Sequence, residues 1–405
     1  MKYILALLLI LFASYSDIFL YRIHINPAPP SQLLIPLFLA VFILTYPLKS
    51  FIDIVKSHTF KFLLFLFLLS VVYAAFSEAS QEILISKISL NLITLLFYSF
   101  SLHFFRTENR QTKLLVLVVS FIVLSASIWF DFLIGLPEYS TKLAESVRKG
   151  GFGENPNQAA SGVKFLALSI LSLIFMQTTK KYLVVALLVA TVFITLSRSG
   201  IVSVILILIL VNINNWNPRF EITLDKLFKS FFKMIFLFSL LYIALLSLSD
   251  VIKTNFPAFT RGAAGERLDM ILGKSDKGVI EEDTHARGGR GALFIKYLNE
   301  FMEEPLGHGT GYTTDQNFNS LNTHNYYLFL AVNLGIIALG AYLFYILFGF
   351  RLSIRYDLFF YFIFWTLIFF EGFISHGMLY ERPIIICLAF FDSMIYKGIN
   401  HELNE

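Results

Sequence analysis

Three groups of residues late in the chain have the types and spacing for chemistry on an anionic substrate. They are Arg287-Gly288-Gly289-Arg290-Gly291, Glu304-Pro305-Leu306-Gly307 and Thr323-His324-Asn325. A guanidinium group pairs bidentately with phosphate or carboxylate, and a histidine can carry a proton near neutral pH. All three groups fall in one polar segment, residues 250–325, of an otherwise apolar chain. The segment therefore suggests an anionic, lipid-linked substrate.

The glycine-rich group precedes a short amphipathic helix predicted over 292–303. A helix start exposes backbone N–H groups and a positive dipole end, which suit a phosphate, and Arg290 and Arg287 would add donors. A flexible loop whose arginines pair with the acidic residues 281–283 explains the same cluster. The segment 250–325 holds eight Lys or Arg against eleven Asp or Glu, so its arginines must act locally.

His324 precedes an apolar run, at the expected membrane interface. A general base must hydrogen-bond the hydroxyl that it deprotonates and needs a pKa near the working pH. His324 is the candidate for that role, although a helix-capping or interfacial histidine is the plainer interpretation. Composition does not select it, because His285, His308 and His376 lie on the same expected side.

Arg198 lies between two apolar runs that are short for full membrane spans. Charged residues at membrane depth are costly and usually functional, so a tight turn could hold Arg198 in an outward-facing cavity. The alternative is an interfacial arginine that extends to the lipid headgroups.

A second polar loop contains Arg148-Lys149-Gly150-Gly151 and precedes the helix that carries Lys164. Arg148 and Lys164 could contact phosphate or sugar, or the glycines could simply form a turn. Near the C-terminus, Glu371, Glu381 and Arg382 are expected to form a structural ion pair.

Composition identifies an integral membrane protein. The 405 residues are 57% hydrophobic and 15% charged, whereas a soluble chain carries roughly 25% charged residues. The single cysteine, Cys387, excludes a disulfide framework and a zinc cluster. The sequence has no Walker loop, no H-E-x-x-H motif and no D-x-D pair on an outward loop. We therefore expect metal-independent chemistry with no cofactor and no nucleic-acid partner.

A spanning helix needs about 20 apolar residues. About twelve spans are predicted, at 3–21, 32–48, 60–76, 84–105, 113–134, 159–177, 181–196, 199–213, 229–248, 326–350, 357–375 and 380–396.

The short basic connections fix the expected orientation. Lysines and arginines gather around 49–61, 106–113, 180–181, 226–233 and 351–355, which places these connections and both termini in the cytoplasm. The other connections then face outward, at 22–31, 77–82, 138–157, 197–199, 250–325 and 375–382.

Taken in order, these motifs resemble the O-antigen ligase and O-antigen polymerase superfamily of bacterial membrane glycosyltransferases. The resemblance rests on Thr195-Leu196-Ser197-Arg198-Ser199-Gly200, Gly289-Arg290-Gly291-Ala292-Leu293, Glu304-Pro305-Leu306-Gly307-His308-Gly309 and Thr323-His324-Asn325, with Asn155-Pro156-Asn157 ahead of them. The chain departs from the pattern after the His-Asn pair. Asn333, Gly335 and Ala338 stand where many relatives carry an acidic residue and a Gly-x-x-Gly pair.

The resemblance implies transfer of a glycan from undecaprenyl diphosphate to an acceptor hydroxyl, with inversion, on the periplasmic face of the bacterial inner membrane and among its lipids. It implies that Arg198 and Arg290 bind the diphosphate and that His324 is the base on the acceptor hydroxyl. Further substrate-binding candidates are Arg287, Arg148, Lys164 and Asn325.

A ligase, with the lipid A–core saccharide as acceptor, is favoured because one late loop dominates. A polymerase, with another lipid-linked repeat unit as acceptor, stays open because of the loop at 138–157. A glycan transporter would show two related halves with interrupted helices at matching positions. A structural scaffold would leave Arg198 unexplained.

The predicted fold is an all-α polytopic membrane protein of the GT-C-like class, with about twelve transmembrane helices. Residues 1–249 form nine of them, residues 250–325 form the large periplasmic loop with short helices and catalytic motifs, and residues 326–405 form three helices and a short cytoplasmic tail.

Overall fold

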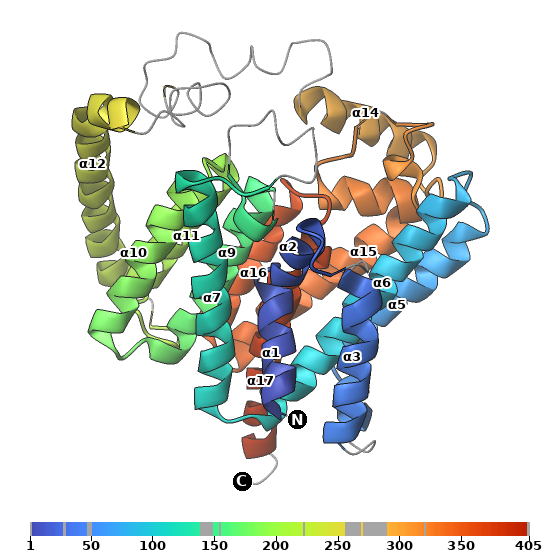
Figure 1. Cartoon of the computed structure of the whole chain (residues 1–405), viewed down its shortest axis with the longest axis horizontal. Coiled ribbons are helices and arrows are strands. Elements are labelled where there is room, and N and C mark those ends of the chain that lie inside the picture. The colour runs from blue at the N-terminus through green and yellow to red at the C-terminus, as the bar shows by residue number, and fades with distance from the viewer. Residues whose placement is uncertain are drawn as a thin grey trace.

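The computed structural model describes residues 2–26, 30–46, 51–137, 149–153, 155–221, 223–255, 269, 290–319 and 321–402. Within these ranges the chain is helical and contains no strand. Figure 1 shows the helices gathered in one bundle, with α14 at one end and both termini at the opposite end.

Every one of the twelve predicted apolar segments forms a helix. The helices are α1 (Lys2–Ala13), α2 (Ser16–Arg22), α3 (Pro30–Thr45), α5 (His58–Ala74), α6 (Gln81–Thr107), α7 (Arg110–Leu133), α9 (Pro156–Ile174), α10 (Thr178–Ile194), α11 (Arg198–Ile213), α12 (Leu224–Asn255), α15 (Tyr326–Arg355), α16 (Phe359–Gly372) and α17 (Arg382–Glu402). The first segment is divided, because α1 and α2 meet at 69°. Short elements join them: α4 (Phe51–Val55), η2 (Gly151–Gly153), α14 (Arg290–Glu303), η5 (Tyr312–Thr314) and η6 (Met378–Tyr380).

Four described helices are long and apolar enough to cross a membrane, namely α6, α7, α9 and α15, and the bent pair of α1 and α2 is a fifth candidate. The helices α5, α11 and α16 are apolar but shorter. The described part of the chain is therefore all-helical, as in a multi-pass membrane protein. The twelve-span count and the GT-C-like class stay predictions.

The core is centred on α9, where every residue from 159 to 174 is buried. α9 packs against α7, α10, α11 and α17, and α17 also packs along α6. Because its whole surface is covered by other helices, α9 carries small and apolar residues on all sides. α12 packs on α11 at the edge of the bundle (Figure 1).

α15 is bent at Gly335, whose φ of 71° and ψ of −172° interrupt the helix. The loop after α14 supplies the missing hydrogen-bond partners: His308 N–H donates to Val332 O (2.8 Å) and Gly309 N–H donates to Asn333 O (3.0 Å). A Cβ at Gly335 would collide with Leu306 O. The Glu-Pro-Leu-Gly-His-Gly motif is thus the segment that packs into the bend.

The helix predicted over 292–303 is present as α14, which begins two residues earlier. Its buried residues Leu293 and Tyr297 pack on Leu328 and Val332 of α15. This contact holds the C-terminal part of the predicted loop against the first half of α15.

Candidate functional site

A polar cavity of about 110 Å³ lies at one end of the bundle, where α9, α11 and α15 begin and α16 ends. All of these termini belong to connections predicted to face the same side of the membrane. The cavity is lined by Asn155, Asn157, Gln158, Ser161, Ser199, His324, Glu371, Ile374, Ser375, His376, Gly377, Met378 and Glu381.

Three capped helix starts meet at this cavity. Asn155 accepts a hydrogen bond from Asn157 N–H (2.9 Å) at the start of α9, and Ser197 Oγ accepts one from Gly200 N–H (3.2 Å) at the start of α11. Asn325 Oδ1 accepts one from Leu328 N–H (3.0 Å) at the start of α15. Helix N-termini carry positive partial charge, so the cavity is suited to an anion such as a phosphate.

His324 occupies a backbone conformation that is costly for a side-chain-bearing residue. Its φ is 48°, in the left-handed region, where a residue other than glycine costs about 1–2 kcal/mol. The conformation places the half-buried imidazole in the cavity wall, with its ring centroid 5.6 Å from that of His376. Strain of this kind concentrates at functional sites.

Two titratable groups of the cavity wall have shifted pKa values. Burial raises the pKa of the Glu381 carboxyl group to about 7, although Tyr15 O–H donates a hydrogen bond to it (2.7 Å). Burial, helped by the neighbouring His324, lowers the pKa of His376 to about 4. At neutral pH the wall therefore holds a neutral imidazole at His376 and a carboxyl group at Glu381 that readily gains or loses a proton.

Lys164 is buried, and its ammonium group pairs with the Glu371 carboxylate. Its Nζ also lies 3.2 Å from Ser203 Oγ, which in turn donates to Glu371 (3.1 Å). Lys164 is not among the residues that line the cavity, whereas Glu371 is. The structure thus shows Lys164 neutralising a carboxylate of the wall, and its predicted substrate contact stays a prediction.

The four predicted arginines differ in how much of each residue the structure describes. Arg198 is the exposed first residue of α11, next to Ser199 of the cavity wall. Arg290 is the first residue of α14, and its side chain lies outside the described part of the structure. Arg287 and Arg148 also lie outside the described residues.

Asn325 has a local structural task, because its side chain caps α15. Asn333, which stands where many relatives carry an acid, connects α15 to the loop at Thr313 by side-chain hydrogen bonds. Its Nδ2 donates to Thr313 Oγ1 (2.7 Å), and its Oδ1 accepts from Thr313 N–H (3.1 Å).

The ion pair expected among Glu371, Glu381 and Arg382 is wrong in its partners. Arg382 pairs with Asp17 of α2, Glu371 pairs with Lys164, and Glu381 accepts from Tyr15. Sequence reasoning missed these pairings because they join segments more than 200 residues apart. The only local signal was the presence of two acids beside a turn in an apolar region.

Comparison with known families identifies part of the chain. None of the curated proteins compared matches it. Residues 183–343 match the family model described as O-Antigen ligase. The matched segment runs from α10 into α15 and includes Arg198, Arg290 and His324, whereas Lys164, Glu371 and Glu381 lie outside it. The match over this segment supports the resemblance to the O-antigen ligase and polymerase superfamily.

Proposed function

We propose that the chain is an O-antigen ligase-type glycosyltransferase that moves a glycan from undecaprenyl diphosphate to a lipid A–core hydroxyl on the periplasmic face of the inner membrane. The observation that carries the proposal is the cavity in which His324, in a strained backbone conformation, lies among three capped helix starts. The family match supports glycan transfer of the ligase or polymerase type.

The donor's diphosphate would bind at the helix starts. Their backbone N–H groups and positive dipole ends favour the charge that develops on the departing diphosphate. Arg198, exposed beside Ser199 of the cavity wall, is the first proposed diphosphate ligand. Arg290 is the second proposed diphosphate ligand, with Arg287, Arg148 and Asn325 as further proposed contacts.

His324 would accept the proton of the acceptor hydroxyl. The hydroxyl oxygen attacks the anomeric carbon, the bond from that carbon to the diphosphate oxygen breaks, and undecaprenyl diphosphate leaves with the electron pair. Attack from the face opposite the leaving group inverts the anomeric configuration. No step requires a metal ion or a cofactor. Positioned acid–base groups typically contribute 10²- to 10⁴-fold to such a rate.

Glu381 is a second candidate for proton transfer. Its pKa of about 7 suits it to exchange protons near neutral pH, and it lines the same cavity as His324. We propose that Glu381 relays the proton away from the site, while His324 contacts the hydroxyl.

The test is transfer by the purified protein from undecaprenyl-diphosphate glycan, with and without lipid A–core, in the presence of EDTA. Glycan that appears on the core only when core is supplied is the expected result. Longer glycan on undecaprenyl diphosphate without core would establish the alternative, a polymerase. Absence of any transfer in EDTA that added divalent metal restores would contradict the metal-independent mechanism.

A further inference from the structure

A second cavity lies along the other half of α15 from His324. It is a groove of about 600 Å³ between α5 and α15, and its walls include His58 and Arg355. His324 precedes α15, whereas the α15 residues that line the groove begin at Ala341, beyond the bend at Gly335, and no residue lines both cavities. The groove is therefore not part of the proposed active site.

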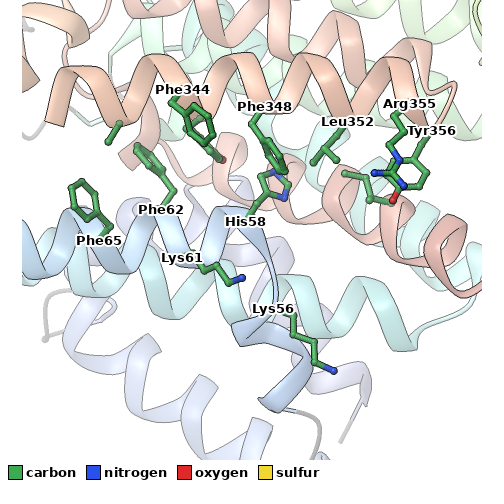
Figure 2. Close-up of a pocket in the computed structure, with 13 residues that line it drawn as sticks. Lys56, His58, Lys61, Phe62, Phe65, Phe344, Phe348, Leu352, Arg355 and Tyr356 are labelled. Atoms are coloured by element: carbon green, nitrogen blue, oxygen red, sulfur yellow. The ribbon is translucent and has the colours of Figure 1, made fainter. Parts of the chain in front are cut away.

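The groove has an apolar half and a basic half. Figure 2 shows Phe62 and Phe65 of α5 along one half, opposite Phe344 of α15. Phe65 is 37% exposed and Phe344 is 69% exposed, so both rings are open to the surroundings of the bundle. Arg355 lies at the end away from Phe65, and Lys61 lies near the middle, below His58 (Figure 2).

Three cations line the basic half: Lys56, Lys61 and Arg355. Among the described residues that line the groove none is acidic. Beside the groove, Asp53 pairs with the exposed Lys56 (3.0 Å). Asp392 lies beneath His58, 3.7 Å from its Nε2, but it is fully buried and accepts hydrogen bonds from Tyr98 and Tyr361 (2.6 Å each). Its carboxylate is satisfied inside the bundle and does not neutralise the groove.

We propose that this groove binds an anionic phospholipid, with the phosphate at Lys56, Lys61 and Arg355 and one acyl chain along Phe62, Phe65 and Phe344. Charge complementarity decides the occupant. Because Lys56 is paired with Asp53, the net positive charge of the groove comes from Lys61 and Arg355. A zwitterionic lipid would leave this net charge unmatched, and a soluble phosphate would leave the aromatic half unfilled. The expected orientation puts this end of α15 at the cytoplasmic leaflet, whose anionic lipids attract basic residues at helix ends.

The binding is measured by native mass spectrometry of the full chain in detergent, titrated with dioleoyl phosphatidylglycerol or dioleoyl phosphatidylcholine. The two lipids share acyl chains and differ in net charge. We expect phosphatidylglycerol to be retained at concentrations about tenfold lower. Glycerol phosphate, the headgroup without tails, should not compete. Equal retention of both lipids, or competition by glycerol phosphate, would overturn the proposal.

Two variants locate the site. The combined change Lys56→Gln, Lys61→Gln and Arg355→Gln should abolish the preference for phosphatidylglycerol. A matched control changes three exposed lysines elsewhere, Lys180→Gln, Lys229→Gln and Lys233→Gln, and should retain it. The same loss in both triple variants would show general surface attraction and refute a built site.

Ala341→Trp gives an independent test, because it fills the apolar half and leaves the charges in place. We expect it to weaken phosphatidylglycerol binding about tenfold or more, with a thermal unfolding transition like that of the unchanged protein. Undiminished binding in a folded Ala341→Trp variant would show that the acyl chain lies elsewhere. This variant decides the matter if the charge variant fails to fold.

Discussion

At the scale of single residues, a glycine substitution at His324 should affect catalysis strongly and stability only slightly. His324→Gly removes the imidazole and relieves the left-handed backbone conformation (φ 48°), which costs about 1–2 kcal/mol for a residue with a side chain. We expect glycan transfer to fall at least about 100-fold, while the free energy of unfolding changes by no more than about 1 kcal/mol. Transfer assays and thermal unfolding in detergent measure the two effects.

His24 provides the matched control, because it has nearly the same backbone conformation (φ 58°) but is exposed in the turn after α2. His24→Gly should leave transfer unchanged. Full transfer by the His324→Gly protein would remove His324 from the mechanism.

Glu381 and His376 should give stability opposite dependences on pH. The folded protein holds a proton on Glu381 between its ordinary pKa of 4.5 and its raised pKa of about 7, so this contribution is lost as the pH rises through about 7. His376, lowered from 6.5 to about 4, contributes stability that is present above 6.5 and lost as the pH falls to about 4. The two effects oppose each other between about pH 4.5 and 6.5.

Single variants should reveal each effect. With Glu381→Gln, stability should rise from pH 4 to 6.5 and stay level above. With His376→Gln, it should fall by about 3 kcal/mol between pH 4.5 and 7.5. Thermal unfolding across this pH range makes the comparison. Curves for both variants that run parallel to that of the unchanged protein would contradict the shifted pKa values.

At the scale of elements, the stability of the bundle depends on the buried ion pair between Lys164 of α9 and Glu371 of α16. Lys164→Met leaves the Glu371 carboxylate buried without its cation, which should cost about 3–5 kcal/mol. Combining it with Glu371→Gln should recover most of that loss. Lys229→Met is the control, since its pair with Asp225 is exposed and should contribute less than about 1 kcal/mol. Equal losses in the free energy of unfolding for Lys164→Met and Lys229→Met would show that the buried pair contributes no more to stability than the exposed pair.

The bend in α15 gives a second prediction. Gly335→Ala forces a side chain into a left-handed conformation and against Leu306 O, so we expect a loss of stability of about 1–3 kcal/mol or more. Because residues 305–309 are hydrogen-bonded at the bend, glycan transfer should fall with it. Gly340→Ala, in the same helix with open space at its Cβ, should be neutral or stabilising by up to about 1 kcal/mol. Equal effects of the two changes on unfolding would refute the argument.

The sequence predicts the helices more completely than it predicts the site. Apolar runs of spanning length located all twelve helical segments, because burial in lipid or protein requires continuous apolar stretches. The same reasoning placed His324 at a helix start but not beside Glu381 and His376. Glu381 and His376 belong to a segment that is distant from His324 in the sequence, and no local sequence pattern shows that the three residues lie near one another. The sequence suggests that Glu304-Pro305-Leu306-Gly307 belongs to a site, and the structure shows this segment packed into the bend at Gly335.

At the scale of the whole molecule, the positions of the two cavities depend on the orientation of the bundle in the membrane. The cavity around His324 and the groove ending at Arg355 lie at opposite ends of α15. The orientation predicted from the positive-inside rule would put the first in the periplasm and the second in the cytoplasmic leaflet. Both proposals therefore share one prediction about orientation, which can be tested without any substrate.

Cys387 is the single cysteine and is buried, so Cys387→Ala gives a background without thiols. Into it we would place Glu304→Cys, exposed after α14, or Thr179→Cys, exposed at the start of α10. A membrane-impermeant maleimide should label the first in intact spheroplasts and the second only after permeabilisation. The reverse pattern would move His324 into the cytoplasm and contradict periplasmic transfer. The lipid groove would then face the outer leaflet, where its three cations would meet fewer anionic headgroups.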